Sequence, residues 1–148
     1  MKGKNQRGTP EVATGPASER TPDTPGRPRR VDKPWGYELV WAETDLYVGK
    51  LLHVNAGESL SLQFHEEKDE TLFLLEGEVL MDLGAGVNSL EPVRFEEGAN
   101  LRIRPGTLHR IEAVTDATIL EASTTELDDV VRIRDRYGRV GPEEANGG

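Results

Sequence analysis

Four residues in the middle of the chain carry side chains that could together hold a metal ion. Gln63 and His65 share one face of an alternating stretch, residues 59–65, whose other face is apolar. Glu70 follows across a charged turn, and His109 comes just after a Pro-Gly pair. Imidazole nitrogens, a carboxylate oxygen and an amide oxygen suit Zn²⁺, Mn²⁺, Fe²⁺, Co²⁺ or Ni²⁺. The residue types alone leave an alternative open, in which the histidines are hydrogen-bonded strand residues and Glu70 lies in a solvated turn.

Short strands are the elements that would have to position these side chains. Stretches rich in aliphatic and aromatic residues alternate with Gly, Pro and Asn turns through the middle of the chain. The expected strands are Tyr37–Ala42, Leu46–Val54, Ser59–His65, Thr71–Leu75, Val79–Leu83, Val93–Phe95, Leu101–Arg104, Leu108–Val114 and Ala117–Ser123. Many short strands at close spacing predict an all-β antiparallel sandwich or barrel.

One segment near the C-terminus has helical character instead. Glu126–Arg134 follows two threonines that could cap a helix, and its acidic residues precede its basic ones. The pattern predicts a short C-terminal helix.

Composition limits the classes of protein to consider. The chain has 148 residues, enough for one domain, and its net charge of −9 argues against nucleic-acid binding. It has no cysteine, which excludes disulfides and thiolate metal sites. No apolar run is long enough for a membrane span, and no apolar segment follows the basic N-terminus as in a secretory signal. We therefore expect a cytoplasmic protein without a membrane partner.

Both ends of the chain differ from its middle. Five of the nine prolines and almost no large apolar residues lie in the first thirty positions, so residues 1–31 are expected to form a disordered tail. Residues 141–148 (GPEEANGG) are expected to form a second tail. The folded domain is then predicted to span residues 32–140.

Two spacings in this middle region resemble the motifs of the cupin superfamily. The pattern GxxxxxQxHxxxxExxxxxxG over residues 57–77 resembles the first motif, with glutamine in place of the usual first histidine. The pattern GxxxxxxPGxxH over residues 98–109 resembles the second motif. The resemblance implies a double-stranded β-helix, or jelly-roll barrel, enclosing one divalent metal. Its ligands would be the matching residues Gln63, His65, Glu70 and His109, with Zn²⁺ or Mn²⁺ favoured.

A narrower resemblance comes from five short segments that occur in order. They are KPWGYE (33–38), LSLQFH (60–65), PGTLHR (105–110), DDVVR (128–132) and DRYGR (135–139). These look like the type II mannose-6-phosphate isomerase group, whose cupin domain also forms the C-terminal part of mannose-1-phosphate guanylyltransferases. The glutamine of the first motif is typical of this group. Lys68 departs from it, because the group usually has an arginine there, and so does Leu72, where an aromatic residue is common.

This resemblance implies a metal-dependent aldose–ketose isomerase that acts on a sugar or a sugar phosphate. Such a reaction moves a proton between adjacent carbons and needs a general base. The candidates for catalysis are Lys50, Lys68 and Glu70, and Tyr37 is a further candidate for the base.

Substrate binding is expected to involve Tyr37 and two arginines, Arg110 and Arg132. Strand alternation directs Arg110 away from its neighbour His109 and thus away from the metal. His53 matches no motif, and we expect no catalytic role for it.

Two other functions fit the same resemblance. One is a different metal-dependent cupin enzyme, such as an iron dioxygenase or a tailoring enzyme of a biosynthetic pathway. The other is a non-catalytic cupin that binds a small ligand.

The apolar face of residues 59–65 also bears on assembly. If Gln63 and His65 face the barrel interior, then Leu60, Leu62 and Phe64 face outward, and such a row needs a cover. Either the N-terminal strands or a second subunit would supply it. We expect a homodimer packed sheet on sheet.

Overall fold

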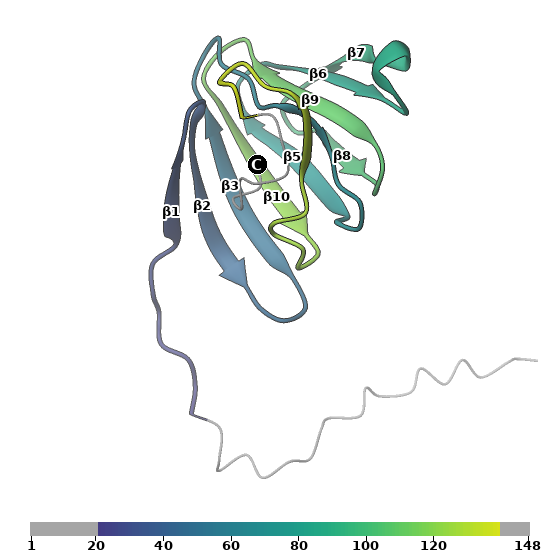
Figure 1. The fold of residues 1–148 in the computed structure, drawn as a ribbon. Helices are drawn as coiled ribbons and strands as arrows, with labels where there is room; N and C mark the ends of the chain where they lie inside the picture. The colour runs from purple at the N-terminus through teal and green to yellow at the C-terminus, as the bar shows by residue number, and fades with distance from the viewer. Residues whose placement is uncertain (1–20, 140–148) are drawn as a thin grey trace, which may run out of the picture.

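Two antiparallel sheets make up the computed structural model, which describes residues 21–139 (Figure 1). The first sheet has the strand order β1-β2-β3-β10-β5-β8, and the second has β11-β4-β9-β6-β7. The first sheet's strands are β1 (Arg29–Lys33), β2 (Gly36–Glu43), β3 (Val48–Val54), β10 (Ala117–Ser123), β5 (Glu70–Glu76) and β8 (Asn100–Ile103). The second sheet's strands are β11 (Val131–Arg134), β4 (Leu62–Phe64), β9 (Leu108–Ala113), β6 (Val79–Gly84) and β7 (Glu91–Phe95). A 3-10 turn, η2 (Val87–Ser89), lies between β6 and β7.

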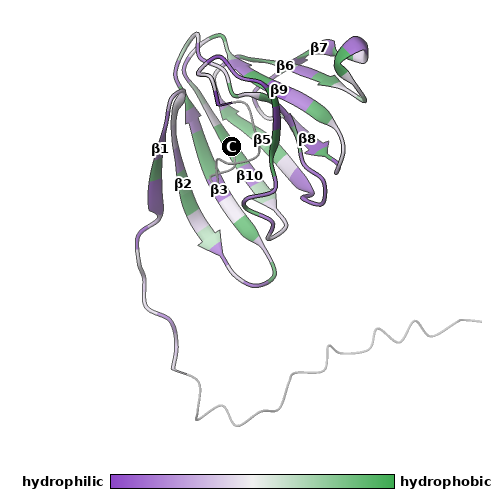
Figure 2. Cartoon of the chain, viewed as in Figure 1, coloured by the Kyte–Doolittle hydropathy of each residue, from purple (hydrophilic) through white to green (hydrophobic). Residues whose placement is uncertain are grey.

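This arrangement confirms the predicted all-β cupin jelly roll. Successive strands pass between the two sheets, so that β4 and β9 pair in one sheet while β5 and β10 pair in the other. Hydrophobic and hydrophilic residues alternate along the strands, as expected when one face of each strand is buried (Figure 2). No helix among residues 21–139 is long and apolar enough to cross a membrane.

The interior changes character from one end of the strands to the other. On β10 the inward residues run from Ala117 and Ile119 to Glu121 and Ser123, all buried. Their neighbours on β3 change in the same direction, because the register places Leu52 opposite Ile119 and Lys50 opposite Glu121. The barrel is therefore apolar at one end and polar at the other.

The predicted C-terminal helix is wrong. Residues 127 and 128 form a turn within a loop, and Val131–Arg134 then form β11, which pairs with β4. A nine-residue segment gains little from helix formation on its own, whereas pairing with the exposed edge of β4 satisfies its backbone groups. The long-range partner thus overrides the local pattern.

The N-terminal end of the domain includes one strand that the pattern did not indicate. β1 begins at Arg29 and pairs with β2 from Arg29↔Val40 to Lys33↔Gly36. The domain boundary expected at residue 32 falls inside this strand. The C-terminal tail expected at residues 141–148 lies outside the described residues, as does most of the N-terminal one.

The structure also changes the argument for a dimer. Leu60 and Leu62 are only 3% and 1% exposed within the single chain, and Phe64 is partly buried. The row of side chains expected to need a second subunit is therefore mostly covered already. The homodimer remains a prediction.

Candidate metal centre

Three strands meet at the polar end of the barrel and bring the motif residues together. Glu70 is the first residue of β5, and His65 directly follows β4. His109 is the second residue of β9 and lies opposite Gln63 of β4 in the register. The turn between His65 and Glu70 returns the chain from one sheet to the other, so the three side chains approach from both sheets.

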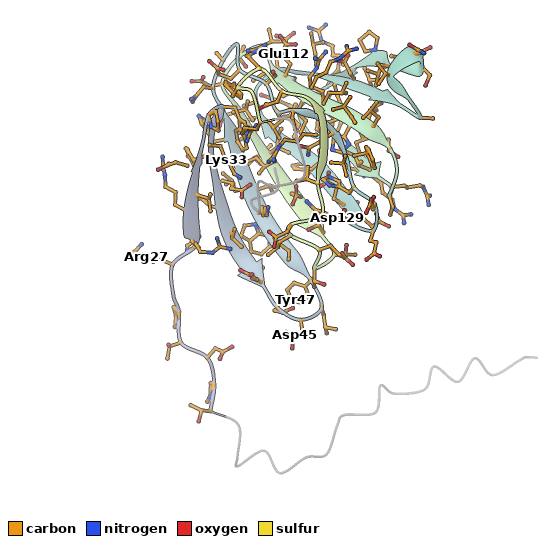
Figure 3. The ribbon with its side chains drawn as sticks, viewed as in Figure 1. Arg27, Lys33, Asp45, Tyr47, Glu112 and Asp129 are labelled. Atoms are coloured by element: carbon orange, nitrogen blue, oxygen red, sulfur yellow. The ribbon has the colours of Figure 1, made fainter. Side chains whose placement is uncertain are left out.

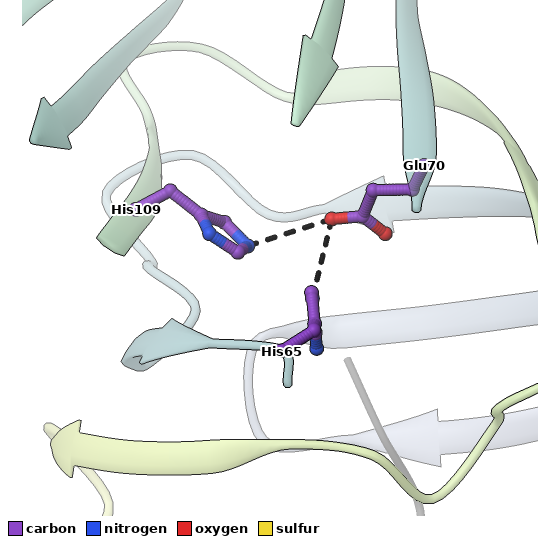
Figure 4. Close-up of side chains that lie close together, drawn as sticks. All are labelled: His65, Glu70 and His109. Atoms are coloured by element: carbon purple, nitrogen blue, oxygen red, sulfur yellow. Dashed lines mark ion pairs between the residues drawn. The ribbon is translucent and has the colours of Figure 1, made fainter. Parts of the chain in front are cut away.

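The donor atoms of His65, Glu70 and His109 converge on one region of the interior (Figure 4). Glu70 Oε1 lies 3.3 Å from His65 Nε2 and 3.4 Å from His109 Nε2. All three donor atoms lie within 4.8 Å of one another, and all three residues are buried. This is the group of potential ligands that the sequence predicted, apart from Gln63.

Backbone carbonyls fix the orientation of both imidazole rings. His65 Nδ1 lies 2.5 Å from the carbonyl oxygen of Asp129, and His109 Nδ1 lies 2.9 Å from that of Thr107. A carbonyl can only accept, so each Nδ1 donates its proton, and Nε2 is the nitrogen of each ring that faces Glu70 and can offer a lone pair to a metal. Metal-bound histidines use their second nitrogen in this way.

This arrangement fits a divalent metal ion. Two nitrogen lone pairs and a carboxylate oxygen that face each other repel unless a cation lies between them. The buried Nε2 of His65 has no hydrogen-bond partner among the residues that the structure describes. Two imidazoles and one carboxylate are the donor set of many Zn²⁺, Mn²⁺ and Fe²⁺ sites.

Gln63 lies beside this group and already makes one hydrogen bond. It is buried, and its Oε1 accepts a hydrogen bond of 2.6 Å from Ser61 Oγ. An amide oxygen has a second lone pair, so this bond leaves the oxygen one site for a further partner.

Lys68 connects the candidate ligand Glu70 to a second buried carboxylate, Glu121. Lys68 Nζ lies 3.1 Å from Glu70 Oε2 and 3.4 Å from Glu121 Oε2.

Burial alone would lower the pKa of Lys68, but the charges of Glu121 and Glu70 outweigh it and raise that pKa. Burial would likewise raise the pKa of Glu70, but the charge of Lys68 outweighs burial and holds that pKa well below its usual value. For Glu121, burial and the charge of Glu70 raise the pKa to about 7.

A second set of buried charges continues from Glu121 across the first sheet. Lys50 lies opposite Glu121 in the register, and its Nζ is 3.5 Å from Glu38 Oε1. Lys33 Nζ is 3.9 Å from the same oxygen. Burial lowers the pKa of Lys33 to about 8, because the attraction of Glu38 does not fully offset it. Positive and negative side chains therefore alternate across neighbouring strands of this sheet.

The residues predicted to contact substrate divide between the two faces of the sheets. Arg132 is buried and lies opposite Gln63 in the register, next to the candidate ligands. Arg110 bonds Asp82 on the neighbouring strand and points away from His109, as strand alternation predicted. Tyr37 stacks on His53 on the outer face, where Arg30 covers its ring. The structure thus does not bring Arg110 and Tyr37 to the candidate site.

Sequence reasoning missed three residues around this site. Glu121 and Glu38 are buried carboxylates, and alternation with Ile119 and Val40 could have placed both in the interior. Asp129, labelled in Figure 3, accepts hydrogen bonds from the backbone N–H groups of residues 66, 67 and 68. No local pattern points to Asp129, because its partners lie about sixty positions away in the chain.

Comparison with known proteins adds a family and two relatives. The family model described as "Mannose-6-phosphate isomerase C-terminal" matches residues 24–135. The mannose-1-phosphate guanylyltransferase of Escherichia coli K12 is 32% identical over 118 residues, as is that of Salmonella typhimurium. The match to the first covers 76% of this chain but only 23% of that enzyme. The chain thus spans about a quarter of the length of these relatives.

Solved structures with the same fold are more distant in sequence. The capsular polysaccharide assembling protein CapF from Staphylococcus aureus superposes with a TM-score of 0.64 at 17% identity, over 76% of this chain and 33% of CapF. An oxalate decarboxylase from Bacillus subtilis, with Mn(II) centres, gives a TM-score of 0.61 at 16% identity, over 73% of this chain and 30% of that one. These two likenesses support the cupin barrel.

Proposed function

The chain belongs to the family of mannose-6-phosphate isomerase C-terminal domains, and on that premise we propose that it is a metal-dependent aldose–ketose isomerase acting on a sugar phosphate. The observation that carries the proposal is the convergence of His65 Nε2, Glu70 Oε1 and His109 Nε2 at the polar end of the barrel. The names of the relatives support the substrate class, because both refer to a mannose phosphate.

A metal at this position would be held by His65, Glu70 and His109, with Gln63 as a fourth ligand. When bound, a divalent ion supplies Lewis-acid stabilisation of the negative charge that develops on substrate oxygens during enolisation. Zn²⁺ and Mn²⁺ fit the nitrogen and oxygen donors best.

The other interior residues would bind the substrate and move its proton. Arg132 presents a buried guanidinium next to Gln63, which suits a phosphate because its N–H groups can bind two oxygens at once. Lys50 and Lys68 each contact a buried carboxylate, and Lys50 would act as a donor toward substrate oxygens. A carboxylate is the more suitable proton acceptor, and the interior holds Glu38 and Glu121 in addition to Glu70.

An isomerase assay on the full chain tests this proposal. The chain is stripped with a chelator, reloaded with Zn²⁺ or Mn²⁺, and incubated with mannose 6-phosphate and then with other aldose and ketose phosphates. We expect interconversion that depends on the metal and falls by at least about 100-fold in His109→Ala. His53→Ala is the matched control, because this histidine stacks on Tyr37 on the outer face.

The proposal fails if the metal-loaded chain converts none of the sugar phosphates. Oxygen consumption by the iron-loaded chain would instead identify a dioxygenase.

A further inference from the structure

The shortest contacts of the candidate ligand Glu70 divide between its two carboxylate oxygens. The ammonium of Lys68 lies 3.1 Å from Oε2, whereas the other oxygen, Oε1, faces both histidines at 3.3 and 3.4 Å. The two oxygens of this carboxylate are thus divided between an ammonium and the candidate metal position.

The ammonium is itself held in place from the far side. Glu121 Oε2 lies 3.4 Å from Lys68 Nζ, and the side chains of Lys68, Glu70 and Glu121 are between 2% and 5% exposed. The backbone N–H of Lys68 donates a 2.8 Å hydrogen bond to Asp129, which also fixes the turn that carries the lysine. Water cannot readily replace a buried ammonium between two carboxylates, because both would lose the cation that compensates their charge.

From this geometry we propose that Lys68 is a positioning residue that restricts Glu70 to monodentate metal binding through Oε1. A carboxylate whose second oxygen is free can rotate and bind a metal with both oxygens. Here rotation would break the contact between Lys68 and Oε2. The inference rests on the metal site of the proposed function and assigns Lys68 a role distinct from proton transfer.

Monodentate binding determines how many metal positions remain for other ligands. With Gln63, His65, Glu70 and His109 each giving one donor atom, an octahedral ion keeps two open positions. Two open positions suit a substrate that binds through adjacent carbonyl and hydroxyl oxygens. A bidentate Glu70 would remove one of them.

Mn²⁺ bound to the full chain tests the role of Lys68 without any enzyme assay. The relaxation rate of water protons reports how many water molecules exchange on the bound Mn²⁺. We expect the relaxivity of Lys68→Met to fall to about half that of the unaltered chain, because Glu70 takes a second position. Lys68→Arg should restore it, since a guanidinium can also bind Oε2. Arg102→Met is the matched control, because this exposed arginine pairs with Asp69, directly beside Glu70.

An unchanged relaxivity in a folded, Mn²⁺-loaded Lys68→Met would overturn the inference. If that variant does not fold, a crystal structure of the unaltered chain with Mn²⁺ decides. The proposal is supported if Glu70 binds the metal through Oε1 alone while Oε2 contacts Lys68. It is refuted if both oxygens of Glu70 bind the metal. Either result is independent of whether the loaded chain isomerises sugar phosphates.

Discussion

Single residues at the polar end of the barrel depend on partners that are buried with them. The ammonium groups of Lys33 and Lys50 share one carboxylate oxygen of Glu38, and Lys68 lies between Glu70 and Glu121. Removing one member of such a pair leaves an unpaired charge in the interior, which costs far more than the loss of an exposed ion pair.

Lys50→Met should therefore lower the free energy of unfolding by about 3 kcal/mol, because Glu38 loses its nearer ammonium and keeps the more distant Lys33. Urea denaturation followed by circular dichroism measures the change. The control is Arg94→Met, which removes an exposed pair with Glu78 and should cost at most about 1 kcal/mol. Equal losses of unfolding free energy in the two variants would show that burial does not increase the contribution of the Lys50–Glu38 pair.

Asp129 links the turn before Glu70 to the orientation of His65. Its carboxylate accepts three backbone hydrogen bonds, and its carbonyl accepts one from His65 Nδ1. Asp129→Ala should weaken Zn²⁺ binding by about 10- to 100-fold, because the turn that positions His65 loses its support. Competition with a chromophoric chelator measures this. Asp128→Ala, one position earlier, should leave the affinity unchanged, and an equal effect at both positions would contradict the account.

At the scale of elements, the tight turns between strands set the register on which the site depends. Gly77 connects β5 to β6 with a φ of +104°, and a Cβ there would lie 2.4 Å from the carbonyl oxygen of Asp116. Gly57 also has a positive φ, +80°, but a Cβ at that position would meet no atom of residues 21–139 within 4 Å. The two glycines share a backbone requirement and differ in the space around them.

Gly77→Ala should consequently destabilise the chain by about 3 kcal/mol or more, since backbone strain and a steric clash add together. Gly57→Ala should cost only about 1 kcal/mol from the strain alone. Thermal unfolding of both variants makes the comparison. Similar losses would mean that the packing of Asp116 against the turn is unimportant.

The elements also show which parts of the structure the sequence could predict. His65, Glu70 and His109 were identified because their spacing within two motifs reflects strands and turns that are local in the chain. β11 and the contacts of Asp129 were missed because their partners lie about sixty positions away in the chain. β1 pairs with the adjacent β2 and was missed because its sequence, RRVDK, is mostly charged. Glu126–Arg134 shows the same limit, since a helix-like pattern formed a strand once the edge of β4 was available.

At the scale of the whole molecule, the candidate ligands join the two sheets. Glu70 belongs to the first sheet, and His109 belongs to the second. An ion bound to both would be lost on unfolding, so binding and global stability are coupled.

Saturating Zn²⁺, at about 100 times its dissociation constant, should stabilise the fold by about 2.7 kcal/mol. The measurement is the midpoint of thermal unfolding with metal and after chelation. The same increase should appear in His53→Ala and be absent in His65→Ala. An increase of the same size in His65→Ala would place the bound ion elsewhere.

The most direct test of the metal centre is a calorimetric titration of the metal-free full chain with Zn²⁺ and with Mn²⁺. The arrangement of His65, Glu70 and His109 predicts one ion per chain for the unaltered protein and for His53→Ala. It predicts no binding at that site in His109→Ala, whose circular dichroism spectrum should stay that of a folded β protein. Full occupancy in folded His109→Ala, or no binding by the unaltered chain, would contradict it.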